Sequence, residues 1–349
     1  MNHNANRARE RRLFAVWASL LVAMEACEPP SRAREGSGTY FTLGTSAYQI
    51  GPATAWLPGE DESASFGSVI AILGTDSGYV VADGWNQELA FLDPTLRPLR
   101  KVGRRGEGPG EYQFPRRLVR QGETVAVLDE GLVRVSELTS TGDFVRSHQA
   151  SGLVHDLAMH PDLGVLVTGN AFPDHYLVRV TDGELSGFAL VPEAFRTDGA
   201  TSLQLPNNLV TVTPDGLVHV LDGRQLALVS YDQTGEQTGL VLLPREVRTR
   251  QLDEAARITE AFGGPQTVLA VQSVTELRTL ADGRLFVRVT DEANLGFVLD
   301  LHTFEATPVA MPRGEEEWMR SATTFFDGSL LVAGTADRGL TIAEARLVR

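Results

Sequence analysis

Three features of the sequence predict an all-β fold. Short apolar stretches with alternating character recur along the 349 residues, and residues that favour turns separate them. Glycine and proline, with 34 and 17 residues, are numerous enough to supply many tight turns. A glycine also stands at or before the start of the most apolar stretches, at positions 78, 122, 164, 216, 283 and 328. A recurrence on this scale is typical of stacked, strand-rich units.

Each predicted unit contains four strands. The Asp-Gly pairs that begin at Asp215, Asp282 and Asp327 are typical of hairpin turns between such strands. We therefore expect a six-bladed β-propeller with four-stranded antiparallel blades. The second unit shows the order most compactly, with strands over residues 116–120, 124–129, 134–138 and 144–148.

The ring also needs a closing strand. Six units fit between Gly67 and Arg349, and the last of them ends after its third strand. An unpaired edge strand would favour aggregation. The early segment 39–44, TYFTLG, has strand character, and we expect this N-terminal strand to close the ring without a covalent link.

One long interval between units holds a helical pattern. Leu252, Ala255, Ile258 and Phe262 follow helical spacing within residues 245–263, which end in glycine. We expect a short helical insertion here. It could cover a funnel or a blade edge, and a decorative surface insertion is an equal alternative.

Residues 1–26 have the layout of a signal peptide. Four arginines lie among residues 7–12, an apolar run covers Leu13–Met24, and the small residue Ala26 follows. The run of 12 residues is too short to span a membrane, which needs roughly 20 residues of helix. The alternative is a cytoplasmic amphipathic N-terminal helix.

Cys27 is the only cysteine of the chain. Its position resembles that of the lipidated cysteine in bacterial lipoproteins, although Glu25 stands where a small residue is usual. Residues 27–38 are polar and rich in proline and glycine, as in a flexible tether, and we expect residues 39–349 to form the propeller. The sequence thus predicts an exported protein, either lipid-anchored in the cell envelope or secreted.

The charge of the chain restricts its partners. The formal net charge is −14 and the isoelectric point is about 5.0. Nucleic acids and anionic membrane surfaces attract clustered Lys and Arg, so both are disfavoured. We expect a monomer that meets a protein, peptide or glycan partner and that touches the membrane only through a lipid anchor.

Residues 103–115, GRRGEGPGEYQFP, form a glycine-rich loop between two predicted blades. A phosphate-binding loop would need a Lys-Ser or Lys-Thr pair and a following helix, and Pro109 removes a backbone donor where one would be required. We therefore interpret the loop as a connector between blades.

This loop and the strands after it carry a family resemblance. Residues 102–115 with 125–138 are similar to the NHL repeat, in which a G-x-G-x-G-x-F-x-x-P connector precedes two short strands, and Tyr112 replaces the usual Phe. Residues 80–93 resemble the same repeat, whereas later units keep only the strand rhythm. The resemblance implies a six-bladed propeller, often found on exported bacterial proteins that look like lipoproteins.

Ligands of such propellers usually meet the mouth of the central channel. The starts of innermost strands and the loops between second and third strands lie there, so we expect binding residues in those positions. Asp and Asn also favour turns for structural reasons, and this is the alternative for each of them. The predicted binding residues are Arg116, Arg117, His155, Asn170, His175, Asp222 and Arg224, and the same mapping also includes Asp83, Trp85, Asn86, Asp129, Glu130, Asp291 and Asn294.

Catalysis has less support in the sequence. Some propellers that resemble this one are lyases or lactonases that hold a divalent ion in the channel. Only His155 and His175 could share the mouth here, and two histidines of one blade do not make a zinc site, while a Ca²⁺ site from Asp and Asn stays open. No G-x-S-x-G motif is present. We name no catalytic residue and no metal ligand.

The sequence therefore predicts a binding or scaffold propeller that recognises a protein, peptide or glycan at its channel face. The alternative is a metal-dependent lyase or lactonase that uses the same mouth with a divalent cation. A third reading is a structural module within an envelope complex.

Overall fold

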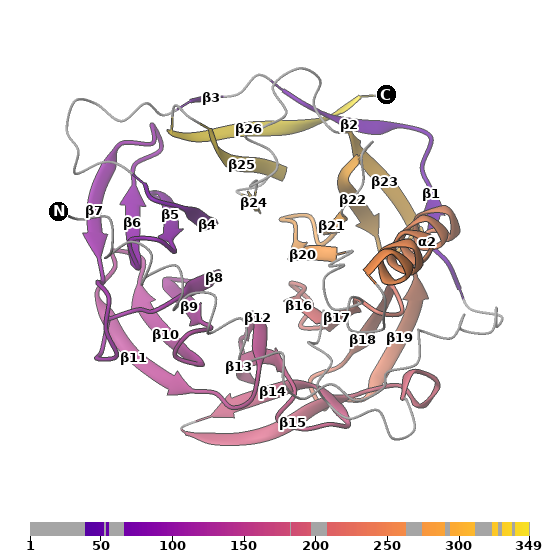
Figure 1. Cartoon of the computed structure of the whole chain (residues 1–349), viewed down its shortest axis with the longest axis horizontal. Helices are drawn as coiled ribbons and strands as arrows, with labels where there is room; N and C mark the ends of the chain where they lie inside the picture. The colour runs from indigo at the N-terminus through magenta and orange to yellow at the C-terminus, as the bar shows by residue number, and fades with distance from the viewer. Residues whose placement is uncertain are drawn as a thin grey trace.

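A computed structural model describes residues 39–51, 54–55, 66–181, 183–196, 208–262, 274–289, 294–310, 323–326, 330–336 and 339–348. Their strands form antiparallel sheets arranged in a ring, with one strand of each group nearest the central axis (Figure 1). This confirms the prediction of an all-β propeller with four-stranded antiparallel blades. The predicted signal peptide, the tether and Cys27 lie outside the described residues. Among the described residues, no helix combines the length and apolar character that crossing a membrane requires.

Four of the sheets contain four strands each, ordered from the axis outward. The first comprises β4 (Val69–Thr75), β5 (Gly78–Asp83), β6 (Glu88–Leu92) and β7 (Pro98–Val102). The second comprises β8 (Pro115–Gln121), β9 (Thr124–Asp129), β10 (Arg134–Thr139) and β11 (Phe144–Gln149). The third comprises β12 (Val154–His160), β13 (Gly164–Gly169), β14 (His175–Thr181) and β15 (Glu184–Leu190), followed by the 3₁₀ turn η2 (Glu193–Phe195). The fourth comprises β16 (Asn208–Val212), β17 (Val218–Asp222), β18 (Ala227–Tyr231) and β19 (Gln237–Leu242).

The remaining strands form one ten-stranded sheet. Its main path runs β20 (Val274–Thr279), β21 (Leu285–Val289), β22 (Asn294–Asp300), β23 (Glu305–Ala310), β2 (Ala47–Ile50), β26 (Gly339–Val348), β25 (Leu330–Ala336) and β24 (Thr323–Phe326). Two short strands, β1 (Thr42–Leu43) and β3 (Thr54–Ala55), pair beside this path. The described strands thus form five sheets, and the predicted count of six blades is not confirmed. The physical reason is β2, which pairs with β26 along its length and also touches β23 through Tyr48 and Val309.

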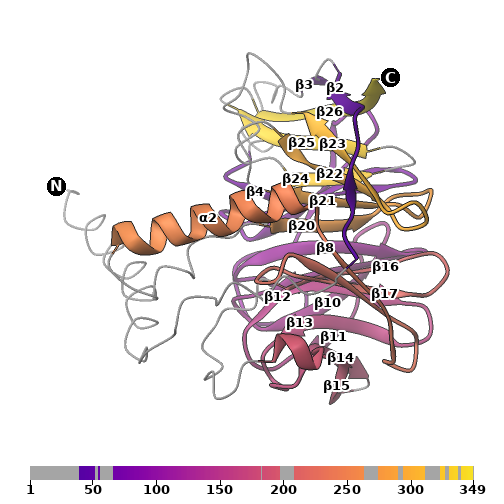
Figure 2. The same cartoon turned by 90° about the vertical axis from the view of Figure 1, so that its right-hand side faces the viewer.

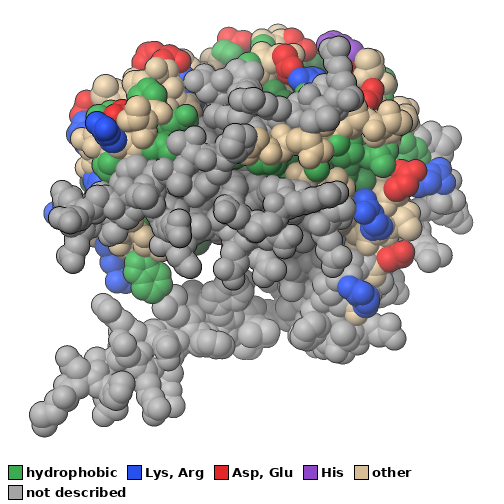
Figure 3. Space-filling model, turned by 90° about the horizontal axis from the view of Figure 1, so that it is seen from above, with side chains coloured by type: hydrophobic (Ala, Val, Ile, Leu, Met, Phe, Trp, Pro, Cys, Tyr) green, Lys and Arg blue, Asp and Glu red, His purple; other side chains and the backbone are tan. Residues whose placement is uncertain are grey.

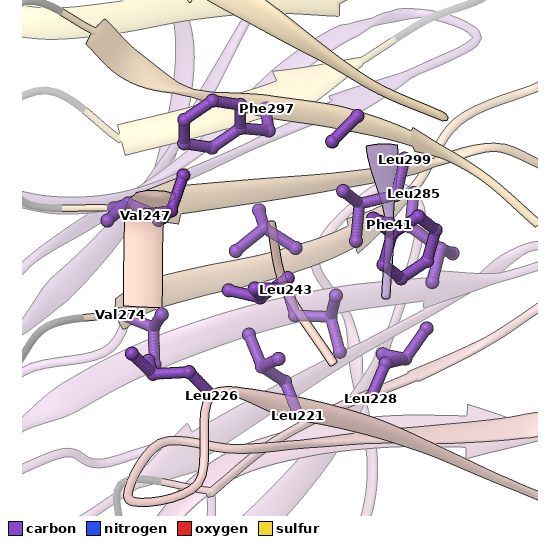
Figure 4. Packing of buried hydrophobic residues seen from close by; sticks show 14 of the residues in the cluster. Phe41, Leu221, Leu226, Leu228, Leu243, Val247, Val274, Leu285, Phe297 and Leu299 are labelled. Atoms are coloured by element: carbon purple, nitrogen blue, oxygen red, sulfur yellow. The ribbon is translucent and has the colours of Figure 1, made fainter. Parts of the chain in front are cut away.

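An N-terminal strand pairs with the last strand, as predicted, but this strand is β2 and not segment 39–44. The strand beside β26 is β2, whereas segment 39–44 lies farther round the ring, between β19 and β23. Burial of Phe41 explains this placement, because its side chain is 2% exposed in an apolar cluster with Leu228 and Leu299 (Figure 4). Its N–H also donates to the carbonyl of Leu242 at 2.9 Å. The segment therefore joins neighbouring sheets instead of filling the last edge.

The predicted helical insertion is confirmed as α2 (Arg245–Phe262). It begins just after β19, and its first turn is held to the ring by Val247, which is buried in the cluster around Phe41. The guanidinium groups of Arg245 and Arg248 lie 5.0 and 5.7 Å from the ring centre of Tyr40. The helix projects from one face of the ring (Figure 2).

The glycine-rich loop joins β7 to β8 and uses its polar groups internally. The guanidinium of Arg134, on β10, donates to the carbonyl oxygens of Glu107, Gly108 and Glu111 at 2.6–3.1 Å. The carboxylate of Glu111 accepts from the N–H of Gly108 at 2.9 Å. Charge-assisted bonds of this kind are stronger than neutral ones, so Arg134 stabilises the connector.

Tyr112 in this loop is fully buried, and its hydroxyl has no hydrogen-bond partner among the described residues. Burial raises the pKa of the hydroxyl, and the ring lies so close to Gly103 that a Cβ there would sit 2.6 Å from it. A buried donor without a partner reduces stability. The NHL connector, which has Phe at this position, avoids that loss.

We predict that Tyr112→Phe raises the free energy of unfolding by about 1–2 kcal/mol, because it removes an unsatisfied buried hydroxyl and keeps the ring. Urea denaturation measures the change. The matched control is Tyr176→Phe, which removes a hydroxyl that donates to Asp222 at 2.7 Å and should lower stability by about 1–2 kcal/mol. Equal losses in the two variants would contradict the prediction.

Candidate functional site

One end of the sheets carries the turns that could form a site. Neighbouring strands are antiparallel, so the turns between second and third strands lie at the same end as the connections from one sheet to the next. We call this end the mouth face, and α2 projects from it (Figure 2). Its turns cover residues 84–87, 130–133, 170–174 and 223–226.

Three of these turns begin with a buried aspartate. Each carboxylate accepts hydrogen bonds from backbone N–H groups two or three residues later, and two of them also bind the N–H groups that lead into the innermost strand. These aspartates stabilise the turns, so they have a structural role and are not free to bind a ligand. The donors, at 2.7–3.1 Å, are Gly67, Ser68, Trp85 and Asn86 to Asp83, Gln113, Phe114 and Leu132 to Asp129, and Arg224 and Gln225 to Asp222.

Four of the innermost strands have a β-bulge close to the mouth. The pairing register shifts near the start of β4, β8, β12 and β20, at Ile70, Arg116, His155–Asp156 and Thr275. A bulge inserts a residue that has no partner opposite and turns its side chain away from the regular alternation. The sheets therefore present extra side chains at the entrance of the channel.

Arg116, Glu130 and His155 meet at this entrance. Arg116 Nη1 donates to Glu130 Oε2 at 3.0 Å, and the other carboxylate oxygen, Oε1, lies 3.6 Å from His155 Nδ1. The second distance is too long for a hydrogen bond. Glu130 Oε1 and His155 Nε2 are both buried, and neither has a hydrogen-bond partner in the described part of the chain.

Farther along the innermost strands, around the ring axis, an ion-pair network surrounds Asp156. Its carboxylate is fully buried, with Oδ1 3.2 Å from Arg117 Nε and 3.6 Å from Arg278 Nη1. Oδ2 accepts from the N–H of Val210 on β16 at 3.0 Å. Arg278 also lies 3.4 Å from Glu276. Four sheets thus contribute to one buried network through their innermost strands.

Burial controls the electrostatics of this network. Desolvation lowers the pKa of Arg117 most strongly, and the neighbouring Asp156 carboxylate raises it again in part. Burial likewise lowers the pKa of Arg288, and the nearby carboxylate of Glu276 raises this pKa again in part. Both guanidinium groups titrate far above neutral pH in proteins, so they stay charged and require the carboxylates.

Aromatic side chains lie beside the entrance. Trp85 is 75% exposed at the turn after β5, and Phe114, just before β8, is 38% exposed. A Cβ on Gly67 would lie 2.8 Å from Trp85, and one on Gly84 would lie 3.7 Å from the Phe114 ring. The N–H of Glu130 donates to the carbonyl of Phe114 at 3.1 Å. The backbone of Phe114 therefore contacts the turn that carries Glu130, whereas Trp85 belongs to the corresponding turn of the first sheet.

The structure brings together only part of the predicted binding set. Arg116, Arg117 and His155 contribute to the entrance and the channel, whereas Arg224 is exposed at a turn of another sheet. Asn170 accepts from the N–H of Leu153 at 2.8 Å and holds its own turn. His175 lies with its ring 6.2 Å from that of Phe172 and serves local packing.

Two further predicted positions can be placed. Asp222 accepts from Tyr176 as well as from its own turn, so its oxygens are engaged. Asn294 starts β22, and Asp291 lies outside the described residues. Sequence reasoning missed Asp156, Glu276 and Arg278. The sequence signal that could have identified them is a charged residue inside an otherwise apolar strand. Such residues occur in Val154–His160 (VHDLAMH) and Val274–Thr279 (VTELRT).

Metal ligands do not converge in the described residues. No group of three or more His, Cys, Asp or Glu side chains there lies close enough to hold an ion. His155 lies beside Glu130 of the second sheet, and His175 packs within the third. These residues do not fit a metal site of the usual ligand number.

The outer wall has a different character from the channel. On the side seen in Figure 3, acidic and basic side chains are scattered among apolar and other ones, and no large area of one sign is visible among the coloured residues. Charged groups gather around Asp156 on the innermost strands and around Glu137 on β10, which pairs with Arg146 and His148 of β11.

Comparisons with known proteins identify the fold. No family description and no curated protein sequence matches the chain, so membership of the NHL family is not shown. A protein from Bacteroides fragilis named as an exported protein is similar in structure, with 13% identity, coverage of 89% of this chain and 98% of its own, and a TM-score of 0.55. Virginiamycin B lyase from Staphylococcus aureus has 12% identity, coverage of 80% of each chain and a TM-score of 0.50. At these identities, the likeness shows a β-propeller and nothing finer.

We predict that Asp156→Asn lowers the free energy of unfolding by about 3–5 kcal/mol, because it leaves the buried guanidinium of Arg117 without its counter-charge. Chemical denaturation measures the loss. The control Asp143→Asn removes an exposed carboxylate that pairs with Arg100 and should cost less than about 1 kcal/mol.

The double variant Arg117→Met with Asp156→Leu tests the cause. Removal of both charges should restore part of the stability lost in Asp156→Asn, since no unpaired charge remains from this pair. Additive losses would show that the ion pair is not the reason.

Proposed function

We propose that the protein is a binding or scaffold propeller that recognises its partner at the mouth face. One observation carries this proposal: the partly exposed side chains of Arg116, Glu130 and His155, which come from neighbouring sheets, meet at the mouth face. Loops and strand ends that a rigid scaffold holds in place commonly carry the binding residues of a protein.

The scaffold around these atoms supports recognition. Arg116 and His155 stand at bulges in paired strands, so the sheets hold both side chains in place before any partner arrives. Binding by a preorganised site loses less conformational entropy. The exposed aromatic side chains of Trp85 and Phe114 add apolar contact area on the same face of the ring.

The alternative function is a lyase or lactonase. The observation in its favour is the juxtaposition of a carboxylate and an imidazole, Glu130 and His155, which are the groups used for general acid and base catalysis. The metal-dependent form is less well supported, because three ligands do not converge in the described residues.

We also propose that residues 1–26 direct export and that Cys27 carries a lipid, with residues 27–38 as the tether and residues 39–349 as the propeller domain. The basic and apolar pattern of the N-terminus supports export. A monomer held in this way would approach the membrane only through its anchor.

The ten-stranded sheet supports one finer proposal on architecture. We infer that it works as two blades, which gives the six-bladed ring of the NHL type. Strands β20 to β23 follow the order of the four-stranded sheets, and β2 completes β24 to β26 in the same way. A single residue pair, Tyr48 with Val309, links β2 to β23.

We predict that Cys27→Ser moves the protein from the membrane fraction to the soluble fraction of its native host, since one cysteine would carry the anchor. Fractionation with immunoblotting measures the partition. Ser19→Ala lies in the apolar run and should leave the anchor in place. Equal partition of Cys27→Ser and the natural protein would contradict lipidation.

We predict that the immobilised protein retains a component of an envelope extract and that Arg116→Glu with His155→Ala reduces retention at least about tenfold, as for residues central to an interface. The control Arg100→Glu makes the same charge change on the outer strand β7, where the side chain is 47% exposed, and should bind normally. Equal retention by both variants would overturn the mouth as the binding site.

A substrate panel separates binding from catalysis. Lactone and peptide-amide substrates are offered with Mg²⁺ or Ca²⁺, and we expect no turnover. Turnover that disappears in His155→Ala would replace the binding proposal with the enzyme alternative.

A further inference from the structure

Two buried histidines lie at the far side of the ring, the end opposite the mouth face, where the turns between first and second strands stand. His160 ends β12 in the third sheet, and His219 lies within β17 in the fourth, and each is 1% exposed. Both contact the turn 213–217, which joins β16 to β17. The burial of two titratable groups at one turn requires an explanation separate from the candidate site.

The ring of His160 is held as a neutral tautomer. Its Nδ1 accepts from the backbone N–H groups of Asp162 and Leu163 at 3.0 and 3.1 Å, so this nitrogen carries no proton. Nε2 therefore carries the proton and donates to the carbonyl of Gly216 at 3.0 Å, which joins the third sheet to the fourth. A proton on Nδ1 would turn the acceptor into a donor that faces two other donors. Protonation is thus incompatible with these contacts.

His219 is neutral for a second reason. Its Nε2 lies 3.0 Å from Thr213 Oγ1, and its Nδ1 lies 2.8 Å from Ser230 Oγ. The Thr213 hydroxyl donates to the carbonyl of Leu217 at 3.2 Å, so it accepts from Nε2, and Nδ1 then accepts from Ser230. Burial lowers the pKa of His219 to about 4, and the carboxylate of Asp215 opposes this shift in part.

Few charged groups lie near the two rings, and several of them are already engaged. Arg179 Nε donates to the carbonyl of Leu163 at 3.1 Å, and Asp282 pairs with Arg284 at 2.7 Å. In the described part of the chain, no carboxylate pairs with either imidazole, so an added proton gains no ion pair. These groups are Asp162 and Asp215 in the two turns, Arg179 on β14, and Asp282 and Arg284 in the turn after β20, which contacts β16 through Thr279 and Thr211.

We propose that the contact between the third and fourth sheets at the far side is an acid-sensitive switch. Protonation of His160 and His219 releases the turn 213–217 from the third sheet, while the rest of the ring stays folded. The apolar cluster between these sheets, which includes Leu166, Val220 and Tyr231, holds their strands together. The inference goes beyond the proposed binding function and does not rest on it, because it concerns the opposite end of the ring.

The direction of the pH dependence follows from the number of bound protons. A histidine released into water binds a proton near pH 6.5, whereas His219 in the closed turn does so only near pH 4. The stability that the neutral ring contributes is therefore complete above pH 6.5 and is lost as the pH falls towards 4. The equilibrium constant for opening should rise at least about tenfold between pH 7 and pH 5.

Hydrogen–deuterium exchange of the full-length protein at pH 7 and pH 5, corrected for the intrinsic exchange rate, tests the proposal. We expect the protection of residues 160–164 and 213–217 to fall at least about tenfold at pH 5, since local opening exposes these amides. The internal control is the turn 121–124, at the same end of the second sheet, which contains no histidine. Its protection should stay constant.

Matched variants separate the two histidines from a general effect of acid. His160→Asn keeps an acceptor for the N–H groups of Asp162 and Leu163, and His219→Gln keeps a donor and an acceptor, but neither new side chain titrates. The double variant should lose the response to pH. His302→Gln removes an exposed histidine from a far-side turn of the ten-stranded sheet and should keep the response. Circular dichroism at pH 7 verifies that each variant is folded.

Each outcome decides for or against the switch. Equal protection at pH 7 and pH 5, or an equal loss in the natural protein and the double variant, overturns it. Loss of protection in every sheet at once would show global unfolding and would also contradict it. If the double variant does not fold, His160→Asn alone decides, because a response as large as that of the natural protein excludes His160 as a trigger.

Discussion

The ring depends on one buried carboxylate, that of Asp156. A charge without water around it is very unfavourable unless opposite charges and hydrogen bonds replace the solvent. Arg117 and Arg278 supply the charges from two other sheets, and the backbone of Val210 supplies a hydrogen bond from a third. Because each partner belongs to a different sheet, the charge of the carboxylate is compensated only when the innermost strands are correctly placed around the axis.

The mouth face combines a constant framework with variable side chains. Aspartates at the start of the turns fix the backbone, and Asp83 of the first sheet and Asp222 of the fourth accept from equivalent N–H groups. The next positions then differ freely, with Trp85 in one sheet and Arg224 in another. The bulges add a second source of variation at the strand starts. A rigid scaffold can in this way present a specific patch without any change to its own stability elements.

Much of the fold follows from local patterns. The apolar stretch 124–129 and the helical spacing of 245–263 correspond to β9 and α2, because alternation, turn glycines and helical periodicity are local properties. The partner of β26 was predicted wrongly, since segment 39–44 and β2 have similar strand character. Only the burial of Phe41 among neighbouring sheets decides between them.

The candidate site was less accessible to such reasoning. Strict alternation places Arg116 and Arg117 on opposite faces of a strand, and a bulge that cannot be read from alternation changes this. Asp156 finds Arg117 and Arg278 across the axis, which depends on the closed ring and not on sequence spacing. Asn170 and Asp222 were predicted as binding residues, but their oxygens are engaged by backbone N–H groups of the turns.

The pairing of β2 with β26 also affects how the ring can fold. Ala47 lies opposite Val348, so the two strands that close the ring are far apart in the sequence. Contacts so distant along the chain form slowly, because the intervening loop must first close. Until they form, the edges that β2 and β26 cover stay open to pairing with other chains.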